Sequence, residues 1–298
     1  MTALGIGLPY FQDLPPEIYR GGAVDFVEVT PEVLCRERRG GALDLLPDKL
    51  AAARKTCGAL PIVVHGVELS IGSAHGCNAA YLDLLDRFQA SWPFLWHSEH
   101  LGFQTIAGED AHSLNTGVPL PLPATREAAE LVADRSAAIA QRYGVPFLLE
   151  NAAHYLPDLP SDPEIGDDVG LMNAIIDRGG CLQLLDLHNV WCNALNHGHD
   201  PFAAIDRMRL DRVAEIHIAG GSWHDGFWMD AHDSRVPEPV WDLLEYTLPR
   251  VPAVGGVVFE VLEEHLPRLG TDAIVHELTR ARAIWQRRGP SRCDRSCH

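Results

Sequence analysis

Short apolar runs recur along the whole chain, and segments with helical spacing separate them. Eight runs have the length and composition of buried strands: 4–7, 26–29, 62–67, 94–101, 147–151, 181–189, 213–220 and 257–262. Apolar residues recur at intervals of three and four in the intervening segments 43–56, 79–89, 126–143, 171–178, 201–207, 239–248 and 272–287. This alternation predicts an α/β protein in which eight parallel strands close into a (β/α)8 barrel.

Six of the eight runs carry a histidine or a carboxylate at or just beyond their C-terminal ends. These residues are His65, His100, Glu150, Asp186, His217 and Glu260. The C-terminal ends of all barrel strands face one rim, where barrels of this kind hold their active sites, so we expect these side chains to converge. The long segments 68–78, 102–123, 191–200 and 221–239 follow strands and are expected to form loops over the same rim.

Glu150, Asp186 and Glu260 end strands that are otherwise apolar. An isolated buried charge is costly, and three carboxylates in one barrel mouth would repel one another. The strand runs that carry them contain no Lys or Arg, so bound cations are the expected compensation, with hydrogen-bonded neutral acids as the alternative. Asp230 and His232, two residues apart after the seventh run, form an arm suited to one such cation. Carboxylate and imidazole ligands suit iron, manganese or zinc.

Composition narrows the class of protein. The 298 residues include 24 Lys and Arg against 41 Asp and Glu, and the formal charge of −17 argues against nucleic acid as a partner. Seven irregularly spaced cysteines form no disulfide framework and favour a reducing compartment. No apolar stretch is long enough to span a bilayer and no signal-peptide pattern is present, so we expect a cytoplasmic protein without a membrane partner. We predict one domain over 1–288 and a disordered tail over 289–298.

In order and separation, the motifs resemble the multinuclear non-heme iron-dependent oxidative enzymes, the MNIO family. The resemblance covers nearly the whole predicted barrel. It is carried by Gly5-Ile6-Gly7-Leu8, Val27-Glu28-Val29-Thr30-Pro31-Glu32, His65-Gly66-Val67, Ser98-Glu99-His100-Leu101, Leu149-Glu150-Asn151, Asp186-Leu187-His188-Asn189, His217-Ile218-Ala219-Gly220, Asp230-Ala231-His232 and Phe259-Glu260. The arrangement is also similar to the three-metal layout of xylose isomerase-like and endonuclease IV-like barrels.

The resemblance implies a ligand set for two or three iron ions. The implied ligands are His65, His100 and Glu150 for the first ion, Glu150, Asp186, His217 and Glu260 for the second, and Asn189, Asp230 and His232 for the third. Among them, Glu150, Asp186 and His217 are the residues expected to carry catalysis. Glu150 would bridge the first two ions.

Five further residues are candidates for contacts to ligands or substrate. His188 departs from the family pattern, which often has Asn at this position, and is expected to be an extra ligand or a partner of a ligand. Glu28, Glu99 and Asp233 are candidates to hold a ligand or to contact substrate. Glu215 is also a candidate to hold a ligand histidine, and strand alternation favours outward side chains for both Glu99 and Glu215.

The resemblance also implies a reaction. A mixed-valent Fe(II)/Fe(III) centre would use O2 to oxidise a side chain, most often cysteine, in a ribosomally made precursor peptide. A separate leader-recognition protein is a possible second partner. Three alternatives stay open at this point: a zinc- or manganese-dependent hydrolase, a sugar isomerase, and a non-catalytic metal-binding protein. Oxygen consumption by the reduced protein would separate the iron-dependent oxidative enzyme from a non-catalytic metal-binding protein.

Overall fold

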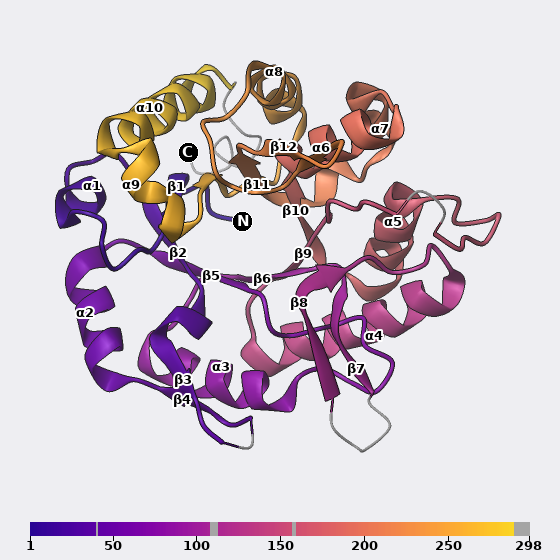
Figure 1. Ribbon diagram of the computed structural model, residues 1–298, viewed down its shortest axis with the longest axis horizontal. Coiled ribbons are helices and arrows are strands. Elements are labelled where there is room, and N and C mark those ends of the chain that lie inside the picture. The colour runs from indigo at the N-terminus through magenta and orange to yellow at the C-terminus, as the bar shows by residue number, and fades with distance from the viewer. Residues whose placement is uncertain (40, 108–112, 157–158, 289–298) are drawn as a thin grey trace, which may run out of the picture.

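The computed structural model describes residues 1–39, 41–107, 113–156 and 159–288, and its centre is a closed barrel of eight parallel strands (Figure 1). Around the barrel the order is β1, β2, β5, β6, β9, β10, β11 and β14, which pairs again with β1. The bounds are β1 Gly5–Pro9, β2 Phe26–Val29, β5 Ile62–Gly66, β6 His97–His100, β9 Phe147–Glu150, β10 Leu182–Asp186, β11 Val213–Ala219 and β14 Gly256–Glu260. Each predicted run supplies one strand, which confirms the (β/α)8 barrel.

Helices surround the barrel (Figure 1). They are α1 Pro16–Arg20, α2 Pro47–Cys57, α3 Ala79–Ser91, α4 Arg126–Tyr143, α5 Asp168–Gly179, α6 Leu187–His197, α7 Pro201–Arg207, α8 Glu238–Thr247, α9 Leu266–Leu269 and α10 Thr271–Arg287. Local sequence sets their ends. For example, the Thr125 side chain accepts a hydrogen bond from Ala128 N at the start of α4, and Gly144 ends that helix with a φ of 66°.

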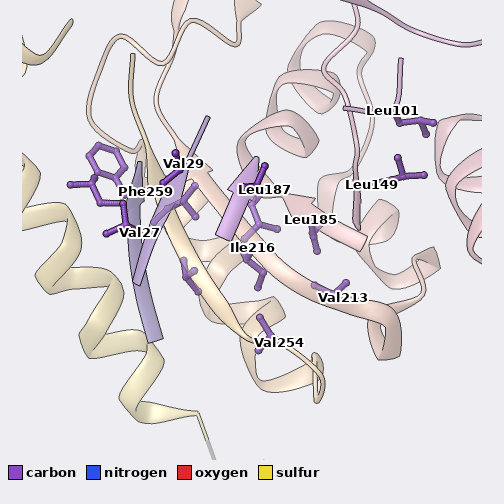
Figure 2. Packing of buried hydrophobic residues seen from close by; sticks show 14 of the residues in the cluster. Val27, Val29, Leu101, Leu149, Leu185, Leu187, Val213, Ile216, Val254 and Phe259 are labelled. Atoms are coloured by element: carbon purple, nitrogen blue, oxygen red, sulfur yellow. The ribbon is translucent and has the colours of Figure 1, made fainter. Parts of the chain in front are cut away.

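Alternation along the strands divides the apolar residues into two layers. Outward-facing residues such as Val27, Leu149, Leu185 and Phe259 belong to a large cluster that includes the helices (Figure 2). A separate small cluster fills the barrel interior: Phe26, Val63, Trp96, Leu148, Leu184, Ala214 and Val258. On five strands, a member of this interior cluster stands two residues before a Glu, His or Asp, so the apolar floor lies directly beneath the polar rim.

Several predicted boundaries were wrong. The run 181–189 is a strand only as far as Asp186, because Asp186 caps helix α6, and the expected loop 191–200 is helical through His197. The segment 43–56 begins with strand β4 (Leu43–Leu45), which pairs with β3 (Cys35–Glu37), before α2 starts. In this segment the short strand pairing of β4 with β3 replaces the first turn of the helix that we had inferred.

Two of the expected rim loops contain hairpins. Strands β7 (Phe103–Ala107) and β8 (Ser113–Leu120) form one, and β12 (Ser222–His224) and β13 (Phe227–Met229) form the other. The five cysteines in the described ranges are free thiols. The predicted tail, 289–298, lies outside the described residues. Among the described helices, none combines the length and the apolar character needed to cross a membrane.

Candidate metal centre

The predicted rim residues come together in overlapping groups. Within each group, the candidate ligand atoms lie within 4.8 Å of one another: His65, His100 and Glu150; Glu150, Asp186, His217 and Glu260; and His188, Asp230 and His232. Glu150 belongs to two groups, as expected for a bridging residue. The strand ends bring the first two groups together because β5, β6, β9, β10, β11 and β14 are parallel neighbours in the barrel, whereas the third group comes from helix α6 and the segment after β13.

The first group has two imidazole nitrogens facing one carboxylate oxygen. Glu150 Oε2 lies 3.3 Å from His65 Nε2 and 3.4 Å from His100 Nε2. Ser98 Oγ donates to Val64 O, so it accepts from His65 Nδ1, and the tautomer this sets leaves His65 Nε2 without a proton. Both His65 Nε2 and Glu150 Oε2 are buried and have no hydrogen-bond partner. Lone pairs therefore face one another across a gap that a cation would fill.

The second group depends on the start of helix α6. Asp186 is the last residue of β10 and the N-cap of α6, and its Oδ1 accepts from Asn189 N at 2.6 Å. Its other oxygen, Oδ2, is buried without a hydrogen-bond partner. The Asn151 side chain fixes the Asp186 backbone, donating to its O and accepting from its N, at 2.9 Å each. The fold therefore holds one Asp186 oxygen and leaves the other free to bind a cation.

His217 is held on both sides of its ring. Its Nδ1 lies 3.1 Å from Glu260 Oε2, and its Nε2 lies 3.0 Å from Glu28 Oε2. Behind Glu28 lies Glu215, which accepts from Trp96 Nε1 at 2.8 Å. A carboxylate on the far nitrogen of a metal-binding histidine fixes the ring orientation and raises its basicity. Glu28 occupies that position relative to His217.

The third group lies under the β12–β13 hairpin. His232 Nε2 and His188 Nδ1 each lie 2.8 Å from Asp230 Oδ1. His232 has a φ of 48°, a strained value for a residue other than glycine, and strain of this kind is typical of functional sites. The predicted third ligand, Asn189, donates through Nδ2 to Glu150 Oε1 and to Asn151 O, while its Oδ1 is buried without a partner. Ligation through Asn189 Oδ1 stays a prediction.

The electrostatics of the cluster oppose the charged forms of Glu150, Asp186 and His65. Burial also opposes the charged forms of Asp230, Glu260, His217 and His232, but the opposite charges beside them outweigh it, so the pKa of each of these carboxyl groups is lowered and the pKa of each of these imidazoles is raised. Burial, and next the Glu260 carboxylate, raise the pKa of Glu150 well above its ordinary value. Burial and then Glu150 do the same to the pKa of Asp186. Burial lowers the pKa of His65 well below its ordinary value, and the neighbouring His100 lowers it further. Cations would reverse this balance by stabilising ionised carboxylates and unprotonated imidazoles.

Two of the predicted outer residues lie away from these groups. Glu99 points to the outer face of β6, where its Oε1 lies 2.7 Å from His97 Nε2. Asp233 accepts from Ser222 Oγ at 2.7 Å and lies 3.4 Å from the Arg268 guanidinium. Neither residue belongs to a group of candidate ligands. A role for them in the site stays a prediction.

Sequence reasoning missed Ser98 and the contact of Trp228, and its expectation that Glu215 faces outward was wrong. Ser98 holds His65, Glu215 adjoins Glu28 and His217, and Trp228 donates to His188 at 3.0 Å. Strand alternation could have indicated the inward position of Ser98 and Glu215, because Ser98 stands two residues before His100 and Glu215 two residues before His217. Trp228 lies in a hairpin, and the sequence contained no signal for its contact.

The donor set fits a multinuclear centre. It supplies oxygen and imidazole nitrogen without thiolate, which suits iron, manganese or zinc. The ligand-type atoms without partners include His65 Nε2, Glu150 Oε2, Asp186 Oδ2 and Asn189 Oδ1. Buried polar atoms are rarely left unpaired in proteins, so these atoms at one rim fit a site that binds cations.

Comparison with solved structures supports the same fold. The D-allulose 3-epimerase from Methylomonas sp. is 13% identical, with a TM-score of 0.54 over 97% of this chain and 98% of that one. A Rhodospirillum rubrum protein provisionally named a xylose isomerase is 16% identical, with a TM-score of 0.50 over 97% of this chain and all of that one. These similarities show a xylose isomerase-like barrel and carry no information on the reaction.

Sequence relatives are closer. A UPF0276 protein of Caulobacter vibrioides is 33% identical over 265 residues, which cover 88% of this chain and 86% of the relative. A UPF0276 protein of Pasteurella multocida is 30% identical over 87% of this chain and 88% of its own length. Residues 4–286 match the model of a family described as RiPP precursor modification enzymes MbnB/TglH/ChrH, where RiPP denotes a ribosomally made, modified peptide. The match confirms the resemblance inferred from the strand-end motifs: the chain belongs to this family.

Proposed function

We propose that this protein is an iron- and O2-dependent oxidoreductase that modifies a cysteine side chain in a ribosomally made precursor peptide. The observation that carries the proposal is the pair of candidate ligand groups that share Glu150 and leave buried lone pairs facing one another. Family membership supports a precursor peptide as the substrate. We place the reaction in the cytoplasm, in keeping with the free thiols of the described cysteines.

Within this proposal the residues have distinct tasks. His65, His100 and Glu150 would hold one iron, and Glu150, Asp186, His217 and Glu260 would hold a second, with the third at Asn189, Asp230 and His232. Bound iron would supply electron transfer with O2 and an open position for the substrate sulfur. Ser98 and Glu28 fix the rings of His65 and His217, so the ligand nitrogens are oriented before a metal arrives.

The mouth has side chains suited to gripping a peptide. Trp223 is 57% exposed and Phe227 is 37% exposed, and both belong to the hairpin above the third group. Trp223 packs edge-on against Trp228, and Phe227 packs edge-on against Tyr155, so both rings are supported from below. Rigid aromatic side chains of this kind supply contact area at low entropic cost. A leader-recognition protein remains part of the proposal as a second partner.

A reconstituted reaction tests the function. Protein loaded with Fe(II) without oxygen is mixed with cysteine-containing peptides encoded near its gene, and O2 is then admitted. We expect O2 consumption and a defined mass change in one peptide, both absent when its cysteine is replaced by serine. Asp186→Asn keeps a capping side chain for α6 but removes the charge, so it should abolish turnover. Glu99→Gln, on the outer face of β6, is the matched control and should retain turnover.

The metals and the products separate this function from its alternatives. Iron-loaded protein that binds its full metal complement, consumes no O2 and leaves every peptide unchanged would contradict the proposal. Turnover of a phosphodiester or a sugar by the zinc- or manganese-loaded protein would replace it with a hydrolase or an isomerase. Anaerobic metal analysis with Mössbauer spectroscopy would establish whether two or three irons are present and in which oxidation states.

A further inference from the structure

His188 lies between an indole from the hairpin and a carboxylate of the third group. Its ring is fully buried, with Nδ1 2.8 Å from Asp230 Oδ1 and Nε2 3.0 Å from Trp228 Nε1. Cys192 Sγ lies 3.8 and 3.9 Å from the two ring nitrogens and is therefore nearly equidistant from them. Each nitrogen consequently has one close polar partner.

The chemistry of tryptophan fixes the direction of both hydrogen bonds. An indole N–H only donates, so His188 Nε2 must accept and carries no proton. The ring proton is then on Nδ1, which donates to Asp230 Oδ1. In this tautomer the nitrogen nearest the third group already carries a hydrogen, and the lone pair of the other nitrogen is occupied by the hydrogen bond from Trp228. Neither nitrogen is available to bind a metal.

The surrounding structure holds this arrangement in place. The Asn196 side chain on α6 donates to Trp228 O at 2.9 Å and accepts from Trp228 N at 2.8 Å, which clamps the hairpin to the helix. Gly221 passes so close to the His188 ring that a Cβ at that position would lie 2.9 Å from Nε2. On the other side, Asp230 N donates to Tyr155 Oη at 2.9 Å. The backbone and the carboxylate of Asp230 are therefore held independently.

We propose that His188 is a positioning residue and not a metal ligand, and that the Trp228 N–H sets its tautomer so that it orients Asp230 toward the third metal. The hairpin that carries the exposed aromatic rings is thereby connected to the metal centre through two hydrogen bonds. This inference rests on the metal centre of the proposed function, because it assigns Asp230 as a ligand. It resolves the two roles that the sequence left open for His188.

Cobalt titration of the full-length, metal-free protein tests the assignment without O2 or peptide, so its result does not depend on the oxidation assay. Bound Co2+ is counted by dialysis and followed by its visible absorption. The equivalent of Co2+ that is lost in the Asp230→Asn variant is the one bound at the third site. Trp228→Phe keeps the ring and deletes only the N–H donor, and it should weaken that same equivalent about 10- to 100-fold. The first two equivalents should be unchanged.

Substitutions of His188 separate positioning from ligation. The amide nitrogen of His188→Asn can take the place of Nδ1 as a donor to Asp230, so this variant should bind the third Co2+ within about threefold of the parent, whereas His188→Leu should match or exceed the loss in Trp228→Phe. Nitrogen NMR of the parent should show a protonated Nδ1 and an unprotonated Nε2 at His188. Loss of the third equivalent in both His188 variants with none in Trp228→Phe would make His188 a ligand and overturn the proposal. Three unchanged equivalents in Asp230→Asn would also overturn it.

Discussion

Two neighbouring His–Glu pairs lie on opposite faces of the barrel wall, and each includes a histidine of strand β6. On the outer face, His97 and Glu99 form a pair at 2.7 Å, and both are fully buried. Burial raises the pKa of Glu99 to about 8 and lowers the pKa of His97 to about 3, so near pH 7 the pair is neutral and needs no ion. On the inner face, His100 faces Glu150 at 3.4 Å, and Glu150 Oε2 has no hydrogen-bond partner.

The comparison shows that buried carboxylates beside imidazoles do not by themselves indicate a metal site. On the outer face, one nitrogen of His97 meets one oxygen of Glu99, although His97 Nδ1 is buried without a partner. On the inner face, His65 and His100 approach a single oxygen of Glu150 at 3.3 and 3.4 Å. Ligands about 2.1 Å from one ion lie roughly 3.0–3.4 Å from one another, so the inner spacing is that of a coordination shell. The convergence of two histidines on one carboxylate oxygen distinguishes the inner cluster from the outer one.

The largest difference between the faces should follow from removing one carboxylate charge on each. Glu150→Gln deletes the proposed bridge, so we expect it to lose the first two metals and to reduce turnover on the order of 1000-fold. Glu99→Gln makes the same chemical change on the outer face and should keep the full metal complement and near-normal turnover. Metal analysis and peptide turnover of both variants check this. Equal metal loss in the two variants would show that the inner and outer clusters do not differ in metal binding.

Removing metal should lower the free energy of unfolding of the protein. Only the inner cluster should contribute to this change. A ligand present at 100 times its Kd stabilises the folded state by about 2.7 kcal/mol per site, so chelation should lower the free energy of unfolding by about that amount for each ion lost. Urea denaturation with and without chelator measures the change. The Glu99→Gln variant should show the same loss on chelation as the parent, because its cluster binds no ion. An unfolding midpoint indifferent to chelator would count against the metal centre.

The outer face should instead respond to pH. Folded Glu99 keeps its proton up to about pH 8, whereas in the unfolded chain it ionises near its ordinary value of 4.5. The folded state thus binds the extra proton between these values, and the free energy of unfolding falls as pH rises, by at most about 1.4 kcal/mol per pH unit. Glu99→Gln should flatten this slope. Denaturation of both proteins at the same metal load from pH 5 to 8 tests it, and parallel curves would contradict it.

The smallest expected effect concerns ring orientation. Ser98→Ala removes the acceptor of the His65 Nδ1 proton but leaves every proposed ligand in place. We expect roughly tenfold weaker binding of the first metal. Loss of the hydrogen-bond partner of a ligand histidine typically weakens metal binding about 10- to 100-fold, and this expectation is at the lower end of that range. Competition with a chelator of known affinity measures this. Unchanged affinity would show that packing alone orients the His65 ring.

The sequence predicted the barrel and most of the site because both follow from alternation. Residues two apart share a strand face, so the apolar residues Val63, Leu148, Leu184 and Val258 precede His65, Glu150, Asp186 and Glu260 on the inner side. The same rule turns Glu99 outward. The order of strands then brought the polar ends together, as in other parallel barrels.

What could not be predicted depends on contacts outside the strands. The residues Leu187 to Asn189 read as a continuation of β10, but the Asp186 carboxylate caps a helix there, and capping is a local competition that apolar patterning does not reveal. The contact of Trp228 with His188 joins residues 40 positions apart and arises from the fold of a hairpin. The two roles left open for His188 needed atomic positions, because only the direction of that bond distinguishes them.

Helix α6 begins at the metal centre and reaches the hairpin, since it carries Asn189 at one end and Asn196, the clamp on Trp228, near the other. Seven residues at 1.5 Å each separate these two amides by roughly 10 Å along the axis. A helix does not stretch, so α6 keeps the clamp on the hairpin at a fixed separation from the amide beside Glu150. The hairpin and this part of the candidate metal centre are therefore held in one rigid frame.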